Sequence, residues 1–251
     1  MNGPVPNNPL ALLNGNFALT AVSQMVTNTA FIGGNVQTDS SGQFSGVLHV
    51  QESNSNCFAV TTDVSFTGNI RGLTLTATSA SVNGQVIMVN AMISSDGKSI
   101  TSGSYSISGG CAGGDHGTIT GFQMQAFTGN YVGGFNVGHG ILSFAIPLTQ
   151  VTIADGHGEF RFNNTIAETV DANTGCGFGS FGASLMTDSA FAAGSVLVLK
   201  LNVFDGSATI VATITFVGVA TDSSAKSVSG TFAITSGLCS GLSGTGTLSH
   251  L

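Results

Sequence analysis

The chain has 251 residues, of which only 7% are charged, and its formal net charge is −7. Its five basic residues stand singly, so it lacks the clustered Lys and Arg side chains that bind nucleic acid or an anionic membrane surface. No run of about 18 apolar residues occurs, so we expect no transmembrane helix. Abundant glycine, threonine, valine and phenylalanine favour strands joined by tight turns, and we predict an all-β protein.

The first residues, 1–12, predict an extended leader, because three of the four prolines lie among residues 1–9. This segment has no charged stretch followed by a long apolar core, so we expect no intact signal peptide. Two interpretations fit this start: a cytosolic protein, or a mature secreted chain from which a signal or lipid-anchor segment has been removed.

Two stretches of the first half predict strands. "LTLTATSAS" (73–81) alternates apolar and hydroxyl side chains, as a half-buried strand does, whereas "QVIMVNAMI" (85–93) is apolar enough for a central strand. Glycine-containing turn signals separate the strands of this half. They occur at 39–43, 82–85 and 95–98. We expect about seven or eight short antiparallel strands in this half.

The stretch "GSYSISGGCAGGDHGTITG" (103–121) surrounds Cys111 with glycines and continues into Asp115 and His116. An aspartate can orient a histidine for base catalysis, but adjacent residues of a strand point to opposite faces. We therefore interpret the stretch as a strand–turn–strand stapled by its cysteine, with Asp115 and His116 in a solvated turn.

The second half contains the densest group of chemically active side chains, "ADGHGEF" (154–160). If this segment is extended, Asp155, His157 and Glu159 share one face and could hold a divalent metal with His139 or Glu168 from a neighbouring strand. The glycines at 156 and 158 favour the alternative, a wet hairpin turn.

Further along, "VLVLKLNVF" (196–204) and "ATIVATITFVGVA" (208–220) predict strands, and "FDGS" (204–207) predicts the turn between them. The segment "GFGSFG" (177–182) is no nucleophile elbow, because phenylalanine stands where that motif requires glycine. We nominate no catalytic residue and no cofactor.

The two halves align with each other. "LNGNFALT" (13–20) matches "FTGNYVGG" (127–134), Cys57 matches Cys176, and Cys111 matches Cys239. We therefore predict an extended leader over 1–12 and two tandem β domains, 13–125 and 127–251. Each is a small antiparallel β-barrel or sandwich, and we favour two separate barrels over one fused architecture.

Four cysteines permit three disulfide pairings. Duplication favours the pairing in which both cysteines of each bond belong to the same copy, Cys57–Cys111 and Cys176–Cys239. Free buried thiols and a zinc site are the alternatives, although structural zinc usually needs closely spaced ligand pairs. Disulfides need an oxidising compartment, so they favour an extracellular or cell-envelope location over the cytosol.

Each copy opens with "NGNF" or "TGNY", has a cysteine near its middle, and later contains "SGSYSISGGCAGGDHGTITG" or its echo. This pattern resembles secreted, lipoprotein-like β-repeats of Acidobacteria-type soil bacteria, over residues 13–125 and 127–249. The resemblance implies a β-rich extracellular or envelope protein and no particular activity. The lipid-bearing cysteine near the start of such lipoproteins is missing, so we expect any lipid anchor only on a native precursor.

These features favour a non-catalytic, secreted or cell-surface structural or binding protein. Its partner would be protein, either an envelope surface or further copies of itself joined through the leader. A carrier of an apolar small ligand in a barrel interior is the first alternative. A hydrolase with a site around Asp155, His157 and Glu159 is the second. A transmembrane barrel is disfavoured because tryptophan is absent and the expected loops are short.

Overall fold

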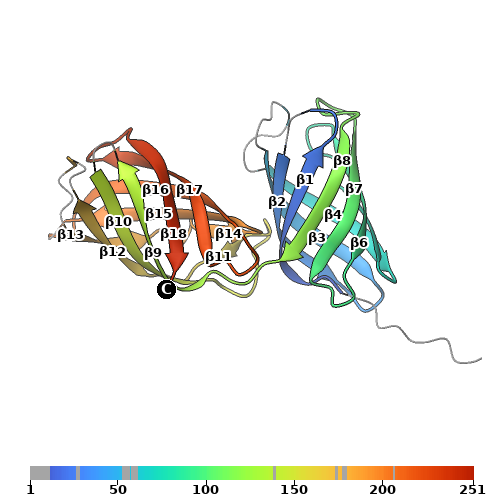
Figure 1. Ribbon diagram of the computed structural model, residues 1–251, viewed down its shortest axis with the longest axis horizontal. Helices are drawn as coiled ribbons and strands as arrows, with labels where there is room; N and C mark the ends of the chain where they lie inside the picture. Colours follow the sequence, from blue (N-terminus) through green and yellow to red (C-terminus); the bar gives the residue numbers. More distant parts are fainter. Residues whose placement is uncertain are drawn as a thin grey trace, which may run out of the picture. The chain divides into compact units, whose positions relative to one another are not determined.

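The computed structural model describes residues 12–26, 29–52, 57, 62–137, 140–172, 175–176, 180–205 and 207–251. All of the elements in these residues are strands, and the chain divides into two compact units, Met1–Gln123 and Met124–Leu251 (Figure 1). The break falls near the junction expected after residue 125. Of the expected leader, 1–12, residues 1–11 lie outside the described residues.

The first unit is a closed antiparallel barrel of eight strands (Figure 1). They are β1 (Gly15–Ser23), β2 (Thr29–Thr38), β3 (Gln43–Glu52), β4 (Thr62–Arg71), β5 (Thr74–Ser79), β6 (Val86–Ile93), β7 (Ser99–Ser108) and β8 (His116–Gln123). Each strand pairs with the next, and β8 returns to β1 with Thr120 opposite Thr20. Because the barrel is closed, its sheet has no free edge. A free edge would need charged side chains to prevent pairing with another chain, and this chain has few of them.

The second unit closes in the same way. Its eight barrel strands are β9 (Thr128–Val137), β10 (Gly140–Thr149), β12 (Ile166–Ala172), β13 (Ser180–Leu185), β15 (Val196–Phe204), β16 (Ile210–Ala220), β17 (Ser227–Gly237) and β18 (Ser243–His250). The β15–β16 pairing and the β18–β9 pairing complete the ring. Two short strands, β11 (Phe160–Arg161) and β14 (Phe191–Ala193), add to it where β14 pairs with the start of β15. The prediction of two separate barrels is confirmed.

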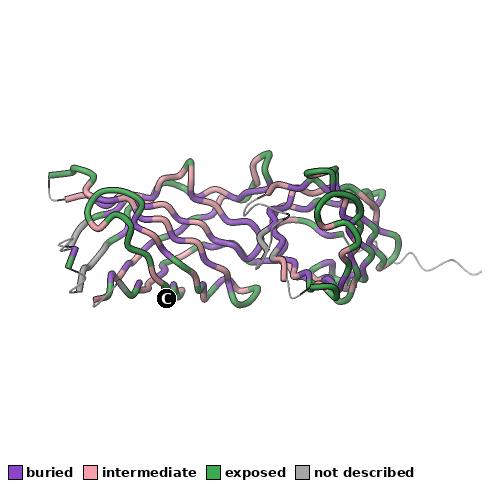
Figure 2. The backbone as a smooth tube through the Cα atoms, turned by 90° about the horizontal axis from the view of Figure 1, so that it is seen from above, coloured by how far each residue is buried: buried purple, intermediate pink, exposed green. Residues whose placement is uncertain are grey.

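Alternation of side chains builds both cores. Residues of β5 and β6 alternate between exposed or half-exposed and buried along their whole length, as a barrel wall with one wet and one dry face requires. Figure 2 shows the same alternation of buried and exposed backbone along many strands. The four strands predicted from the sequence, at 73–81, 85–93, 196–204 and 208–220, are found as β5, β6, β15 and β16. Apolar side chains of these strands are buried in the two cores, and this burial of apolar surface is the main contribution that stabilises the fold.

Aspartate side chains hold several of the hairpin turns. The Asp39 carboxylate accepts the backbone N–H groups of Ser41 and Gln43, two and four residues further along, at 2.8 and 2.9 Å. Asp205 accepts the corresponding N–H groups of Ser207 and Thr209, both at 2.9 Å. These bonds occupy backbone donors that the turn leaves unpaired. The turns predicted at 39–43 and 204–207 are therefore confirmed.

One disulfide lies in each barrel, as predicted. Cys57 is bonded to Cys111 and Cys176 to Cys239, with Cα–Cα distances of 5.4 and 5.6 Å. Each bond joins the segment that follows the third strand of its barrel ring to the last hairpin of that barrel. The two bonds indicate an oxidising, extracytoplasmic environment.

Candidate ligand-binding site

The interior of the first barrel contains an apolar cavity of about 50 Å³. Among the described residues that line it, only Tyr105 and Asp115 carry a polar side-chain atom. The rest are apolar side chains from all eight strands and from Leu13, which precedes β1. Small residues, including Ala21 and Ala30, contribute part of this lining. The cavity exists because these side chains are too short to meet across the barrel.

The same region of the second barrel is filled by aromatic rings. The ring centre of Phe135 lies 4.9 Å from that of Phe144, 5.2 Å from that of Phe216 and 4.7 Å from that of Phe232. All four side chains are buried. Rings at these separations interact favourably beyond the area they bury. The interior of the second barrel is therefore a packed core in this region.

Strand order and register give the corresponding positions of the first barrel. In the sheet register of the second barrel, Phe135 is the cross-strand partner of Leu142; in the first barrel, the corresponding pair is Ala21 and Ala30. Likewise, Phe216 pairs with Phe232 in the second barrel, and Val89 pairs with Tyr105 in the first. The four phenylalanines, in chain order, thus correspond to Ala21, Ile32, Val89 and Tyr105. All four of these residues line the cavity. Three of the four rings are replaced by the smaller side chains of Ala21, Ile32 and Val89, and this replacement opens the first barrel.

A carboxylate lies at one end of this cavity, the end where β1 and β7 finish and β8 begins; we call it the disulfide end, because Cys111 lies there. Asp115 immediately precedes β8 and is half-buried. Its Oδ1 accepts a hydrogen bond from the Ser23 hydroxyl at 2.6 Å, and its Oδ2 accepts one from the Tyr105 hydroxyl at 3.1 Å. Three strands, β1, β7 and β8, therefore converge on one carboxylate.

The backbone fixes Asp115 in this place. Its C=O accepts the N–H of Ile107, and the N–H of Gly114 is bonded to the C=O of Ile107, both at 2.8 Å. The interpretation of Asp115 and His116 as a solvated turn holds for His116, which is exposed. It is wrong for Asp115, because the alternation that turns His116 outward turns its neighbour towards the interior.

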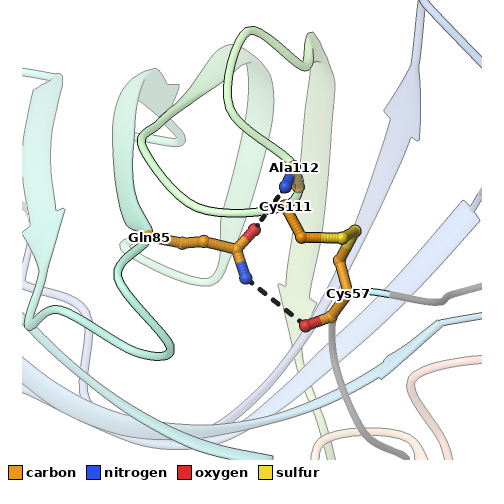
Figure 3. Close-up of a disulfide and its surroundings, with 4 residues drawn as sticks. All are labelled: Cys57, Gln85, Cys111 and Ala112. Atoms are coloured by element: carbon orange, nitrogen blue, oxygen red, sulfur yellow. Dashed lines mark hydrogen bonds between the residues drawn. A yellow bond between two sulfur atoms is a disulfide. The ribbon is translucent and has the colours of Figure 1, made fainter.

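The loops of the disulfide end are tied together by Gln85, which is only 1% exposed. Its Oε1 accepts the N–H of Ala112 at 2.8 Å and its Nε2 donates to the C=O of Cys57 at 3.3 Å, beside the Cys57–Cys111 bond (Figure 3). Gly110 has a φ of +59°, and a Cβ there would come within 2.3 Å of the Gln85 Cγ. The glycines of 103–121 thus make room for this amide. The stapled strand–turn–strand prediction is confirmed.

The second barrel has apolar residues at the corresponding positions. Ile234 donates to the C=O of Leu242 at 2.8 Å, in the way that Ile107 donates to that of Asp115. By the same register, Val137 corresponds to Ser23 and Phe232 to Tyr105. The polar group at the cavity end is therefore specific to the first barrel.

The predicted metal-binding group lies elsewhere, in the second barrel. The Asp155 carboxylate accepts the N–H groups of His157 and Glu159 at 2.9 and 3.0 Å, which is the turn pattern of Asp39. Its Oδ2 also accepts the Arg161 Nε–H at 2.9 Å, and Arg161 forms a second ion pair with Glu159. The structure therefore brings two of the three predicted ligands to an arginine.

The third predicted ligand, His157, is exposed, as is Glu168 on β12, and His139 lies outside the described residues. Among the described residues, no three His, Cys, Asp or Glu side chains lie close enough together to hold a metal ion. The metal site at Asp155, His157 and Glu159 stays a prediction.

Opposing effects set the ionisation of Asp155. Partial burial is the largest single effect and raises its pKa, but the backbone N–H groups of Glu159 and His157, together with the Arg161 guanidinium, outweigh it. The net result is a lowered pKa. This is the behaviour of a carboxylate that holds a turn and an ion pair.

Comparison of the chain with known protein families and with curated protein sequences gives no match. In the part of the chain that the structure describes, no helix is long and apolar enough to cross a membrane. The site is therefore interpreted from its own residues.

Sequence reasoning missed Asp115, Tyr105 and Ser23 as members of one site. A usable signal was present in the duplication, because all three polar residues are replaced by apolar ones in the second copy. Comparing the copies position by position would have separated what both need for the fold from what only the first contains.

Proposed function

We propose that this is a non-catalytic, extracellular or cell-envelope binding protein whose first barrel takes up a small, largely apolar ligand. The observation that carries the proposal is the contrast between the barrels: the first has a cavity with one polar end, where the second has four packed phenylalanines. Ligand sites are commonly apolar cavities with a few placed polar groups. On this proposal the second barrel is a stable support.

The volume limits the ligand. A cavity of about 150 Å³ holds benzene, so about 50 Å³ admits roughly two or three carbon atoms unless side chains move. Longer lipids are therefore disfavoured as ligands of this conformation.

The location rests on the two disulfides and on the resemblance to secreted β-repeats. Self-assembly through the leader stays a prediction, because residues 1–11 lie outside the described part of the chain. A hydrolase site around Asp155 also stays a prediction, and the ion pairs of Arg161 with Asp155 and Glu159 do not favour it.

Xenon tests the proposal directly, because it enters small apolar cavities without needing a polar partner. We expect xenon to shift the methyl NMR signals of cavity-lining residues in the first barrel. Ala21→Val adds two carbon atoms to the lining and should abolish these shifts. Thr120→Val, on an exposed position of the same barrel wall, should leave them unchanged. Absence of any xenon response in the folded wild type would overturn the proposal.

A further inference from the structure

We infer that the ligand of the first barrel is a small amine, whose ammonium group binds the Asp115 carboxylate while its short apolar part occupies the cavity. This inference rests on the proposed function and adds the chemical class of the ligand. It starts from the fact that, among the described residues that line the cavity, Asp115 alone has a side chain that can carry a full negative charge at neutral pH.

The hydrogen bonds at Asp115 identify it as an acceptor. The Ser23 Oγ already accepts the backbone N–H groups of Met25 and Val26, at 3.0 and 3.1 Å. Its single proton is therefore available for Asp115 Oδ1, which lies 2.6 Å away. Tyr105 supplies a second hydroxyl proton to Oδ2. Two hydroxyl donors therefore point at this one carboxyl group, which acts as the acceptor in both hydrogen bonds.

The carboxylate retains capacity for a ligand. Two carboxylate oxygens together can accept about four hydrogen bonds, and the protein's own side chains supply two. In the described part of the chain, no lysine, arginine or histidine side chain forms an ion pair with Asp115. A half-buried negative charge beside an apolar cavity is costly unless it is paired. A ligand ammonium supplies both the missing charge and up to three donors.

The same geometry discriminates against other ligands. A carboxylic acid would place a second negative charge beside Asp115, which is unfavourable. A neutral alcohol can donate one hydrogen bond but brings no charge. The net charge of −7 on the chain also attracts cations over longer distances.

Three probes with the same propyl tail separate these cases: n-propylammonium, propan-1-ol and butyrate. Each is titrated into the full-length, isotope-labelled protein at neutral pH, and binding is followed by NMR shifts of β7 and β8. We expect n-propylammonium to bind at least tenfold more tightly than propan-1-ol, and butyrate to bind most weakly. Added salt should weaken binding of the ammonium and leave that of the alcohol unchanged.

Two variants test the role of the carboxylate. Asp115→Asn should remove the preference for n-propylammonium over propan-1-ol. Asp115→Leu introduces the residue that the second barrel has at this position and should have the same effect. Ala21→Val should prevent binding of all three probes.

The outcomes distinguish the two proposals. If xenon and propan-1-ol bind and n-propylammonium binds no better, the cavity is a ligand site and the amine inference is wrong. If n-propylammonium binds equally well after either substitution at Asp115, the inference is also wrong. If neither xenon nor any probe binds, the proposed function itself fails. Should both variants fail to fold, the ranking of the three probes on the wild type decides.

Discussion

Ala21 in β1 and Phe135 in β9 occupy the same position in the two barrels, and this pair separates a hollow interior from a filled one. Phe135 is fully buried and contacts three other phenylalanine rings, whereas Ala21 lines the cavity of the first barrel. The barrel wall is closed in both cases. The fold therefore tolerates either interior, and the side chains decide which one forms.

Phe135→Ala should destabilise the second barrel by about 3–5 kcal/mol, because it removes a buried ring and leaves a cavity among its neighbours. Calorimetry of the full chain measures this as a lower unfolding temperature of the second barrel. The variant should also gain a xenon response in β16 and β17. Phe122→Ala, at a half-exposed position of the first barrel, serves as the control and should cost less. A loss below about 1 kcal/mol would show that the ring cluster is not a packed core.

Gln85→Ala should destabilise the first barrel by about 1–3 kcal/mol, because it leaves the N–H of Ala112 and the C=O of Cys57 without their amide partner. Urea unfolding of the oxidised protein is the measurement. Gln43→Ala, at an exposed position, should change the free energy of unfolding by less than about 0.5 kcal/mol. Equal effects of the two substitutions would contradict the role given to Gln85.

Arg161→Ala should destabilise the second barrel, because it removes the guanidinium that pairs with the buried Glu159 carboxylate. The expected cost is about 2–3 kcal/mol, below that of breaking a fully buried pair, since about a third of the arginine side chain is exposed. The measurement is thermal unfolding, with the exposed Lys226→Ala as the control. A rise in the Tm of the wild type on adding Zn²⁺ or Ca²⁺ would instead favour the metal site predicted at Asp155, His157 and Glu159.

The turn aspartates predict how stability depends on pH. The Ser41 hydroxyl and the Gln43 N–H lower the pKa of Asp39 below its ordinary value of 3.8, and the Ser207 hydroxyl and the Thr209 N–H do the same for Asp205. A carboxyl group with a lowered folded-state pKa stabilises the fold above its unfolded pKa. That contribution is lost as the pH falls from about 3.8 through the lower folded value.

The Tm should therefore be nearly constant between pH 5 and 7 and fall as the pH drops below about 4. Asp205→Asn keeps an acceptor oxygen but removes the titration, so it should make the fall shallower. Ser207→Ala removes the largest cause of the lowered pKa and should act in the same direction. Acid unfolding curves that are identical for the wild type and both variants would contradict this account.

Much of the architecture is determined by local sequence. Alternation over 73–81 and 196–204 predicts strands because side chains in a strand point alternately to its two faces. The glycine-containing signals at 39–43 and 204–207 predict turns because glycine readily adopts the positive φ angles of tight hairpins. Repetition of Cys57 and Cys111 at Cys176 and Cys239 predicts the disulfide pairing, because two similar domains must be closed in the same way.

The candidate site depends on tertiary structure. Ser23, Tyr105 and Asp115 are up to 92 residues apart, and only closure of β8 onto β1 brings their side chains together. The cavity likewise depends on side-chain volumes summed across eight strands, which no single segment reveals. The local sequence thus determined the strands and turns that form the two barrel walls. Whether a barrel contains a cavity or a packed core was decided by the tertiary structure, because packing depends on which side chains meet after the ring has closed.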